Sequence, residues 1–196
     1  MSRGERNPWT VLETRAIYEN PWMTLVEHKV LTPRGTPGIY GVVSPRSLAL
    51  GVVAFTQTGE IVLVGQYRFP LGRYSWEIPE GGGSKELPPE ISIARELKEE
   101  TGYEAGGWRE LLRLDLSNSI TDETAICYIA WDLRPGPAMP EETEELALRQ
   151  VSFAEALEMV MTGQITDAIS VASLLKVKLL AEQGGLPPQV QQHVKR

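Results

Sequence analysis

Residues 88–102 restrict the possible folds of this chain more than any other segment, because they predict one amphipathic helix with a defined start and end. The segment opens with two prolines, which are tolerated in a first helical turn. Ile93 and Leu97 lie four residues apart and predict a buried stripe. Gly102 suits the left-handed residue that commonly follows a last helical turn. The helix is therefore expected to pack one face against the core and to leave another face accessible.

The accessible face of this helix carries three carboxylates, Glu96, Glu99 and Glu100. Glu96 and Glu100 are i and i+4, so they project from the same face, where like charges destabilise an isolated helix. Clustered carboxylate oxygens are the ligands that Mg²⁺ or Mn²⁺ requires. A divalent cation would turn this repulsion into a binding site. The alternative is an ordinary solvated face in which Arg95 simply pairs with Glu99.

A glycine-rich loop, residues 80–83, lies just upstream of the helix and strengthens the metal interpretation. Loop and helix together resemble the Nudix box, in which a glycine precedes Arg-Glu, an aliphatic residue, any residue, Glu-Glu, any residue and Gly. Gly81 opens the pattern, and residues 95–103 match its second half without a gap. Leu87 occupies the position of the first Glu of the box. In the family that Glu mainly supports the loop and the helix, whereas the later Glu residues hold the metal.

Other segments resemble one branch of the Nudix hydrolases, the ADP-ribose and nucleoside-diphosphate-sugar pyrophosphatases. These segments are residues 66–68, 75–81, 117–123 and 163–168, and the resemblance spans most of residues 11–180. It implies a metal-dependent hydrolase that splits the diphosphate of ADP-ribose or a related nucleoside-diphosphate sugar into a nucleoside monophosphate and a sugar phosphate. Two alternatives stay open. One is another substrate, such as FAD or a dinucleoside polyphosphate, and the other is a non-catalytic module that binds a nucleotide sugar.

The expected metal ligands come from the acidic face of the helix. Glu96 and Glu100 are the primary ligands, and Glu99 is a third ligand or a water-mediated contact. The resemblance adds the backbone carbonyl of Glu80. Arg95 is expected to orient the glutamates rather than to touch the substrate. The expected cofactor is Mg²⁺ or Mn²⁺, since every ligand is an oxygen.

The resemblance also implies a general base on a loop that follows the box. The matching segment here is residues 141–145, and Glu144, followed by Glu142, is the preferred candidate. The alternative for either residue is a solvated acidic loop. Glu99 is the other candidate base, as in other branches of the family.

Five residues are candidates for substrate contacts. Arg68 suits a phosphate because guanidinium offers planar, bidentate donors, with a surface residue of a strand as the alternative. Glu77 would contact substrate or metal, or orient Arg68. Tyr18 and Trp22 would stack on a nucleobase, with packing in the core or at an interface as the alternative. Arg46 is a further candidate.

The remaining pattern predicts an α/β fold. Residues 9–45 suit strands, and residues 48–55 and 61–67 suit two strands of a hairpin. Strands around 111–116 and 126–131 are followed by a short strand and by helices, the last of which covers about residues 166–182. Strands before, between and after helices favour layered packing. This agrees with a Nudix-type α/β/α sandwich that has a mixed sheet and a small N-terminal β segment.

Three parts are expected along the chain: an N-terminal β segment at residues 1–45, a hydrolase domain at 46–183 and a loose tail at 184–196. Residues 22–31 are apolar on both alternating faces, which one compact domain would struggle to cover. The resembling pyrophosphatases are homodimers that build their interface from this segment. A two-fold homodimer is therefore expected.

Composition excludes several other classes of protein. A formal net charge of −7 over 196 residues argues against nonspecific binding to nucleic acid or to an anionic membrane. Cys127 is the single cysteine, so no internal disulfide can form, and its apolar surroundings predict a small buried strand residue. No signal-peptide pattern and no apolar run of about 20 residues is present. The expectation is a cytoplasmic protein with no nucleic-acid or membrane partner.

Overall fold

The computed structural model describes residues 6–139 and 145–194. Contacts within the chain divide it into two units. The smaller unit holds the N-terminal residues up to Ser47 together with Asp115–Glu123, and the larger unit holds the rest. The smaller unit is therefore built from two stretches of chain, whereas the sequence predicted a single N-terminal segment.

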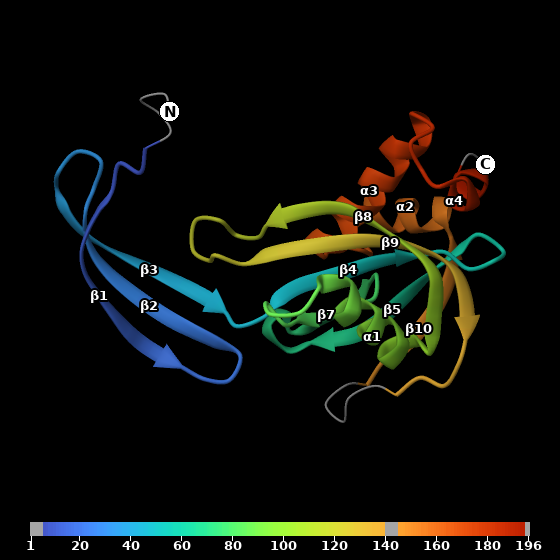
Figure 1. Cartoon of the computed structure of the whole chain (residues 1–196), viewed down its shortest axis with the longest axis horizontal. Helices are drawn as coiled ribbons and strands as arrows, with labels where there is room; N and C mark the ends of the chain where they lie inside the picture. The colour runs from blue at the N-terminus through green and yellow to red at the C-terminus, as the bar shows by residue number, and fades with distance from the viewer. Residues whose placement is uncertain (1–5, 140–144, 195–196) are drawn as a thin grey trace. The chain divides into compact units, whose positions relative to one another are not determined.

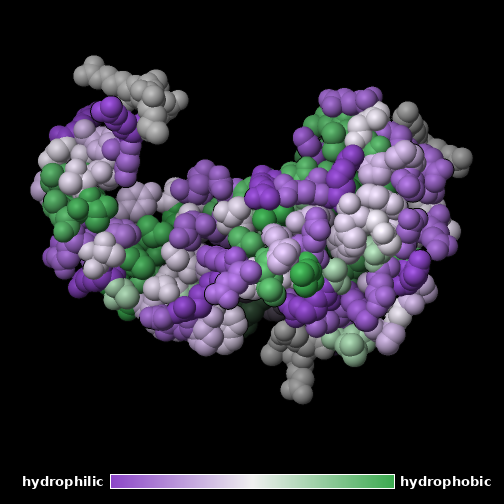
Figure 2. Space-filling view, viewed as in Figure 1, coloured by the Kyte–Doolittle hydropathy of each residue, from purple (hydrophilic) through white to green (hydrophobic). Residues whose placement is uncertain are grey.

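Three antiparallel strands form the smaller unit, as the sequence predicted for residues 9–45. They are β1 (Thr10–Glu19), β2 (Met23–Leu31) and β3 (Pro37–Pro45). Gly35 has a φ of 81° in the β2–β3 turn, a conformation that glycine adopts without steric cost. Every residue of β1 is exposed, and only Val30 is buried in the three strands. Figure 2 shows hydrophobic residues on the surface of these strands.

The second stretch of the smaller unit, Asp115–Glu123, is bound to β3 by backbone and side-chain hydrogen bonds. The amide of Val43 donates to the carbonyl of Ile120 at 2.9 Å, and the Tyr40 hydroxyl donates to the carbonyl of Ser119 at 2.8 Å. The loop that resembles the pyrophosphatase subfamily thus lies beside β3, the outer strand of the N-terminal sheet.

The larger unit carries the remaining elements. They are β4 (Leu48–Ala54), β5 (Glu60–Arg68), the 3₁₀ turn η1 (Phe69–Leu71), β6 (Arg73–Glu77), β7 (Glu80–Gly83), α1 (Pro89–Thr101), β8 (Tyr103–Asp115), β9 (Thr124–Pro135), β10 (Ala147–Ser152), α2 (Phe153–Met161), α3 (Ala168–Glu182) and α4 (Pro188–Val194). One sheet has the order β7-β4-β9-β8 and is mixed, because β4 runs parallel to β9 and antiparallel to β7 (Figure 1). The other sheet is antiparallel and has the order β10-β5-β6.

Alternating residues of β4 show that helices cover both faces of the mixed sheet. Leu50 packs in one buried cluster with Ile93 and Leu97 of α1. The next residue, Gly51, faces the other way, and a Cβ atom there would lie 2.7 Å from Ile169 of α3. Helices α1 and α3 therefore lie on opposite faces of the sheet. The expected α/β/α sandwich with a mixed sheet is confirmed.

Helix α1 has the ends and the buried stripe that the sequence predicted. Ile93 and Leu97 are fully buried. Gly102 has a φ of 75°, and its amide donates to the carbonyl of Lys98 at 2.8 Å, which closes the last turn. Among the described residues no helix combines the length and the apolar composition needed to cross a bilayer.

The prediction that β4 and β5 form a hairpin was wrong. Their connection does turn tightly, since the Thr56 amide donates to the Glu60 carbonyl at 2.8 Å. Beyond one bridge between Phe55 and Ile61, however, the two strands enter different sheets. The reason is that a strand has only two edges, and β7 and β9 occupy both edges of β4.

The prediction of a loose tail after residue 183 was also wrong, because Pro188–Val194 form helix α4. Val190 is fully buried, and Leu186 and Val194 are nearly so. The Gln191 side chain donates to the carbonyl of Ala181 in α3 at 2.9 Å. The polar composition of the tail concealed three apolar residues at spacings of four, which dock this segment.

Replacing Val190 should therefore destabilise the whole larger unit. We expect Val190→Asp to lower the free energy of unfolding by at least about 2 kcal/mol, because it buries an unpaired charge. Gln189→Asp is the control, since Gln189 is exposed in the same helix and should change stability by about 0.5 kcal/mol or less. Urea unfolding measures both values. Equal, small effects of the two substitutions would mean that the C-terminal segment is not docked.

Candidate active site

The acidic face of α1 is organised by Arg95. One guanidinium nitrogen, Nη2, lies 2.5 Å from Glu96 Oε1, and the other, Nη1, lies 2.9 Å from Glu99 Oε2. Both carboxylates are only partly exposed, whereas Arg95 itself is exposed. This is the arrangement that the expected orienting role of Arg95 requires. The positive charge of the Arg95 guanidinium also reduces the repulsion between Glu96 and Glu99.

Glu100 lies on the inner side of the same helix and connects it to β7. Its side chain is buried, and Oε2 accepts a hydrogen bond from the backbone amide of Glu80 at 3.2 Å. A carboxylate that is removed from water needs such a donor, because an unpaired buried charge is costly. The structure thus brings together two residues that are 20 positions apart and were both expected at the metal site.

The glycine-rich segment that was expected as a loop is instead the short strand β7. Its register with β4 pairs Leu48 with Gly83 and Gly51 with Glu80. Segments without bulky side chains can pair and still approach another element closely. At position 81 the close approach requires glycine, because a Cβ atom there would collide with the carboxyl group of Glu96. β7 therefore lies directly against the acidic face of α1.

The Glu80 side chain takes part in a buried network that sequence reasoning missed. Ser170, near the start of α3, donates from its hydroxyl to Glu80 Oε1 at 2.8 Å and accepts from the Ile78 amide at 3.0 Å. Asp167 caps α3 by accepting from the Ser170 amide at 2.7 Å. The only local signal was the spacing of Asp167 and Ser170, which is typical of a helix cap. Nothing local indicated that the cap would meet Glu80.

Burial of the carboxyl group, followed by the charge and hydrogen bond of Asp167, raises the pKa of Glu80 well above its usual range. The charge of Glu77 acts in the same direction, and the Ser170 hydroxyl opposes it. Raising the pKa favours the protonated carboxyl, which can donate to Asp167. The protonated side chain is thus suited to hold β7 in place through hydrogen bonds, whereas binding a metal would require the charged carboxylate. The backbone carbonyl remains the part of Glu80 that the family resemblance implies.

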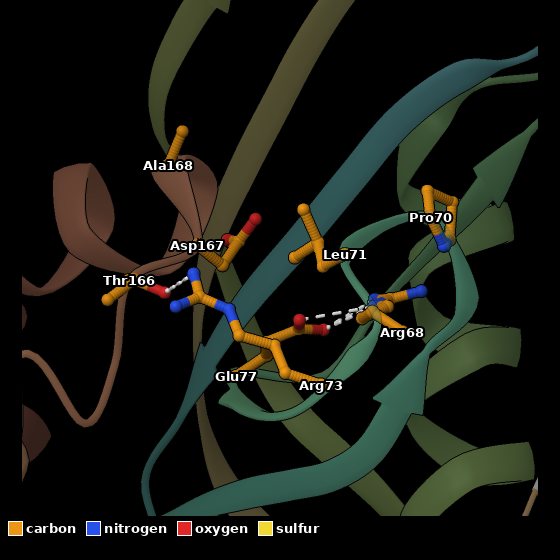
Figure 3. A pocket seen from close by; sticks show the side chains of 8 residues that line it. All are labelled: Arg68, Pro70, Leu71, Arg73, Glu77, Thr166, Asp167 and Ala168. Carbon is orange, nitrogen blue, oxygen red and sulfur yellow. Dashed lines mark hydrogen bonds and ion pairs between the residues drawn. The ribbon is translucent and has the colours of Figure 1, made fainter.

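A cavity of about 340 Å³ lies next to this network. Its lining is formed by Arg68, Pro70, Leu71, Arg73, Glu77, Thr166, Asp167 and Ala168 (Figure 3). Asp167 belongs both to the cavity wall and to the contact with Glu80. The cavity and the acidic face of α1 are therefore connected through Asp167, Glu80 and Glu100.

Two arginines in the cavity have different partners, as Figure 3 shows. Arg68 forms a bidentate pair with buried Glu77, with Nη2–Oε2 at 2.5 Å and Nε–Oε1 at 3.1 Å. Burial alone would lower the pKa of Arg68, but the hydrogen bonds and charge of Glu77 raise it overall, so the guanidinium stays charged. Arg73, which the sequence did not single out, donates to the neutral Thr166 hydroxyl at 3.0 Å.

Three predicted substrate contacts belong to the smaller unit. Trp22 and Tyr18 expose 75% and 54% of their surface, so their rings are available for stacking or for an interface. Arg46 is paired with Glu19 and donates to the carbonyl of Asn20 at 3.0 Å. Their contacts with a substrate stay a prediction. The same holds for the general base, since Glu142 and Glu144 lie outside the described residues.

The donor set suits a hard divalent cation. Glu96, Glu99 and Glu100 supply carboxylate oxygens, and Gly81 leaves room beside Glu96. Across residues 6–139 and 145–194, no three His, Cys, Asp or Glu side chains are already gathered closely enough to hold an ion. Arg95 pairs with Glu96 and Glu99, and Glu100 binds the Glu80 amide. Side-chain movements toward a cation would therefore be needed.

Nucleophilic chemistry at the single cysteine finds no support. Cys127 is fully buried in β9, and burial raises the pKa of its thiol to about 11. A thiol with that pKa is protonated near neutral pH and is a poor nucleophile. The prediction that Cys127 is a small buried strand residue is confirmed.

Comparisons with known proteins agree with this geometry. The family model described as "NUDIX domain" matches residues 45–169, and the model described as "Nucleoside diphosphate sugar hydrolase N-terminal domain" matches residues 9–43. Among solved structures, one described as an ADP compounds hydrolase superposes with a TM-score of 0.80 at 20% identity. That match covers 91% of this chain and 97% of the other, and it shows the shared fold.

Curated relatives include ADP-ribose and GDP-mannose pyrophosphatases. The ADP-ribose pyrophosphatase of Mycobacterium tuberculosis is 36% identical over 66% of this chain, and the chain spans 64% of that relative's length. The ADP-ribose pyrophosphatase of Bacillus subtilis is 32% identical over 67% of this chain and 72% of its own length. The GDP-mannose pyrophosphatase of Escherichia coli K12 is 32% identical over 61% of this chain and 66% of its own length.

The close approach at Gly81 yields a direct test of the cation site. Gly81→Ala should weaken Mn²⁺ binding by about tenfold or more, because the added methyl displaces the Glu96 carboxylate. Gly41→Ala is the control, since no atom lies within 4 Å of the added group there. Isothermal titration calorimetry with Mn²⁺ measures both variants. Unchanged affinity in Gly81→Ala would exclude Glu96 from the site.

Proposed function

The chain belongs to the NUDIX domain family, and from this we propose that it hydrolyses the diphosphate bond of ADP-ribose or a related nucleoside-diphosphate sugar. The products would be a nucleoside monophosphate and a sugar phosphate. The names of the relatives and the two family models support this assignment. Mg²⁺ or Mn²⁺ would be the cofactor, because the donor set consists of carboxylate oxygens.

The contact between Glu100 and the Glu80 amide is the observation that carries the proposal. It places a buried carboxylate at the junction of α1 and β7. Glu96 reaches the same strand at Gly81. Two primary ligand candidates and the Glu80 backbone thus meet where the helix and the strand touch. A module that only bound a sugar would have no need of this charge concentration.

The protein groups suggest how the reaction would proceed. When bound, the divalent ion would neutralise the diphosphate, activate a water and stabilise the leaving phosphate. Glu96 and Glu100 would hold the cation, with Glu99 as a third ligand. Arg95 would keep Glu96 and Glu99 oriented between turnovers. Glu144 or Glu142, or else Glu99 itself, would accept the proton of the attacking water.

The cavity beside Asp167 is a suitable place for the part of the substrate that extends from the diphosphate. Arg68 would contact a phosphate through its planar donors, and Glu77 would hold that guanidinium in position. Basic, acidic and hydroxyl side chains line the cavity together with the apolar Leu71. Such a mixed lining suits a hydroxyl-rich sugar. Arg73 adds a donor that was not predicted from the sequence.

Substitution of the proposed ligands tests the function. Glu100→Gln and Glu96→Gln should each lower kcat for ADP-ribose hydrolysis by at least about 100-fold, or about 2.7 kcal/mol, because a charged ligand is lost. Glu90→Gln on the first turn of the same helix is exposed and should retain activity. Release of nucleoside monophosphate with Mg²⁺, with and without a chelator, is the measurement.

The outcomes separate the alternatives. A folded Glu100→Gln variant whose kcat falls less than about threefold would contradict the ligand assignment. Full turnover after chelation would contradict metal dependence. GDP-mannose, FAD and a dinucleoside polyphosphate belong in the same substrate panel, with product identification. Binding of ADP-ribose by wild-type protein without any cleavage, in the presence of Mg²⁺, would favour the non-catalytic module.

We also infer a homodimer formed through the smaller unit. Its strands leave several large apolar side chains exposed, of which Trp22 and Ile39 expose 75% and 71% of their surface. Apolar surface of this kind commonly marks an interface. A partner subunit would cover it, and the same surface would bring Tyr18 and Trp22 to a nucleobase. Arg46 would be a neighbouring contact.

Trp22→Ala should therefore weaken the dimer and raise KM more than it lowers kcat, because stacking would bind the base without stabilising the transition state. Met161→Ala removes a side chain that is equally exposed, at 76%, from α2 and serves as the control. Light scattering and steady-state kinetics measure the two effects. A wild-type protein that is monomeric at micromolar concentration and fully active would contradict the shared interface.

A further inference from the structure

The Ser170 hydroxyl, in the C-terminal part of the chain, contacts Glu80 of β7 and has no role in the reaction proposed above. It is fully buried near the first turn of α3. It accepts from the Ile78 amide at 3.0 Å and donates to Glu80 Oε1 at 2.8 Å. One hydroxyl thus binds both residues that flank Pro79.

The position of this hydroxyl is set by the start of α3. The Ser170 amide donates to Asp167 Oδ2 at 2.7 Å, which is the capping interaction of the helix. Side chains in a capped first turn have little freedom to move. The hydroxyl therefore transmits the position of α3 to the segment between β6 and β7.

Three backbone polar groups between Ile78 and Glu80 have a defined partner. The Ile78 amide binds Ser170, the Pro79 carbonyl accepts from the Val52 amide at 3.0 Å, and the Glu80 amide binds Glu100. Proline has no amide of its own to donate. The Glu80 carbonyl is the next group along the chain, and these three contacts hold the backbone on its N-terminal side.

We propose that Ser170 is a positioning residue for the divalent cation, which acts by holding the Glu80 backbone in the orientation that the cation needs. The inference rests on the proposed function, because it assumes that Glu80 contributes its carbonyl to the metal site. Ser170 itself touches neither cation nor substrate. Its contribution is to remove freedom from the segment before the cation arrives.

Helix α3 supplies a matched control. Ser173 is also fully buried and lies one turn later in the helix. Replacing it with alanine removes a hydroxyl, as Ser170→Ala does. In the described part of the chain its hydroxyl has no well-formed hydrogen-bond partner. Ser173→Ala therefore reproduces the change in composition and burial without removing a contact to Ile78 or Glu80.

The test is Mn²⁺ titration by calorimetry on the full-length protein without substrate. Ser170→Ala removes two hydrogen bonds of modest net value, so we expect the Kd for Mn²⁺ to rise about fivefold to tenfold, and kcat to fall by more than KM changes. Ser173→Ala should bind Mn²⁺ within about twofold of wild type. Thermal unfolding, measured on both variants, verifies that each is folded at the assay temperature.

The possible results are distinct. Wild-type affinity in Ser170→Ala, while wild type itself binds Mn²⁺, would overturn the positioning role alone. Absence of Mn²⁺ binding by wild type would overturn the proposed function together with this inference. If Ser170→Ala does not fold, Ser170→Cys replaces it, because a thiol has nearly the same size but is a weak donor and acceptor. The same loss of affinity is then expected, and its absence would overturn the role.

Discussion

The hydrogen bond from the Glu80 amide to the buried carboxylate of Glu100 is the interaction on which the rest of the site depends. It joins the helix that carries the acidic residues to the strand that would present a backbone ligand. Desolvating a carboxylate is costly, and the amide partly offsets that cost. Glycine at position 81 then lets the strand approach close enough for Glu96 to lie against it. Charge, burial and chain geometry support one another at this junction.

Local signals in the sequence were sufficient for the elements that have local causes. The start, the buried stripe and the Gly102 cap of α1 follow from spacing and backbone preference within residues 88–102, and all three are present. The separation of β4 from β5 has no local cause, since it depends on β7 and β9 occupying the edges of β4. Helix α4 was missed because its few buried residues are significant only once α2 and α3 are in place to cover them.

The candidate site divides in the same way. Its acidic residues share one helix, and the family pattern identified them together with Gly81. Arg68 and Glu77 were also predicted, and their bidentate pair suits the orienting role considered for Glu77. Ser170 and Arg73 were not predicted, because their partners lie 92 and 93 residues away in the chain. Contacts of such separation have no signature in a single sequence.

The same separation in the chain affects when the site can form. α1 and β7 are synthesised within a short interval, and their contact can form early. Ser170 is synthesised 90 residues after Glu80, so the hydrogen bond between them cannot form until α3 docks. A chain truncated before α3 would therefore hold the acidic helix and β7 without the contacts that Ser170 makes to Ile78 and Glu80. The complete set of contacts around Glu80 therefore requires that α3 has packed.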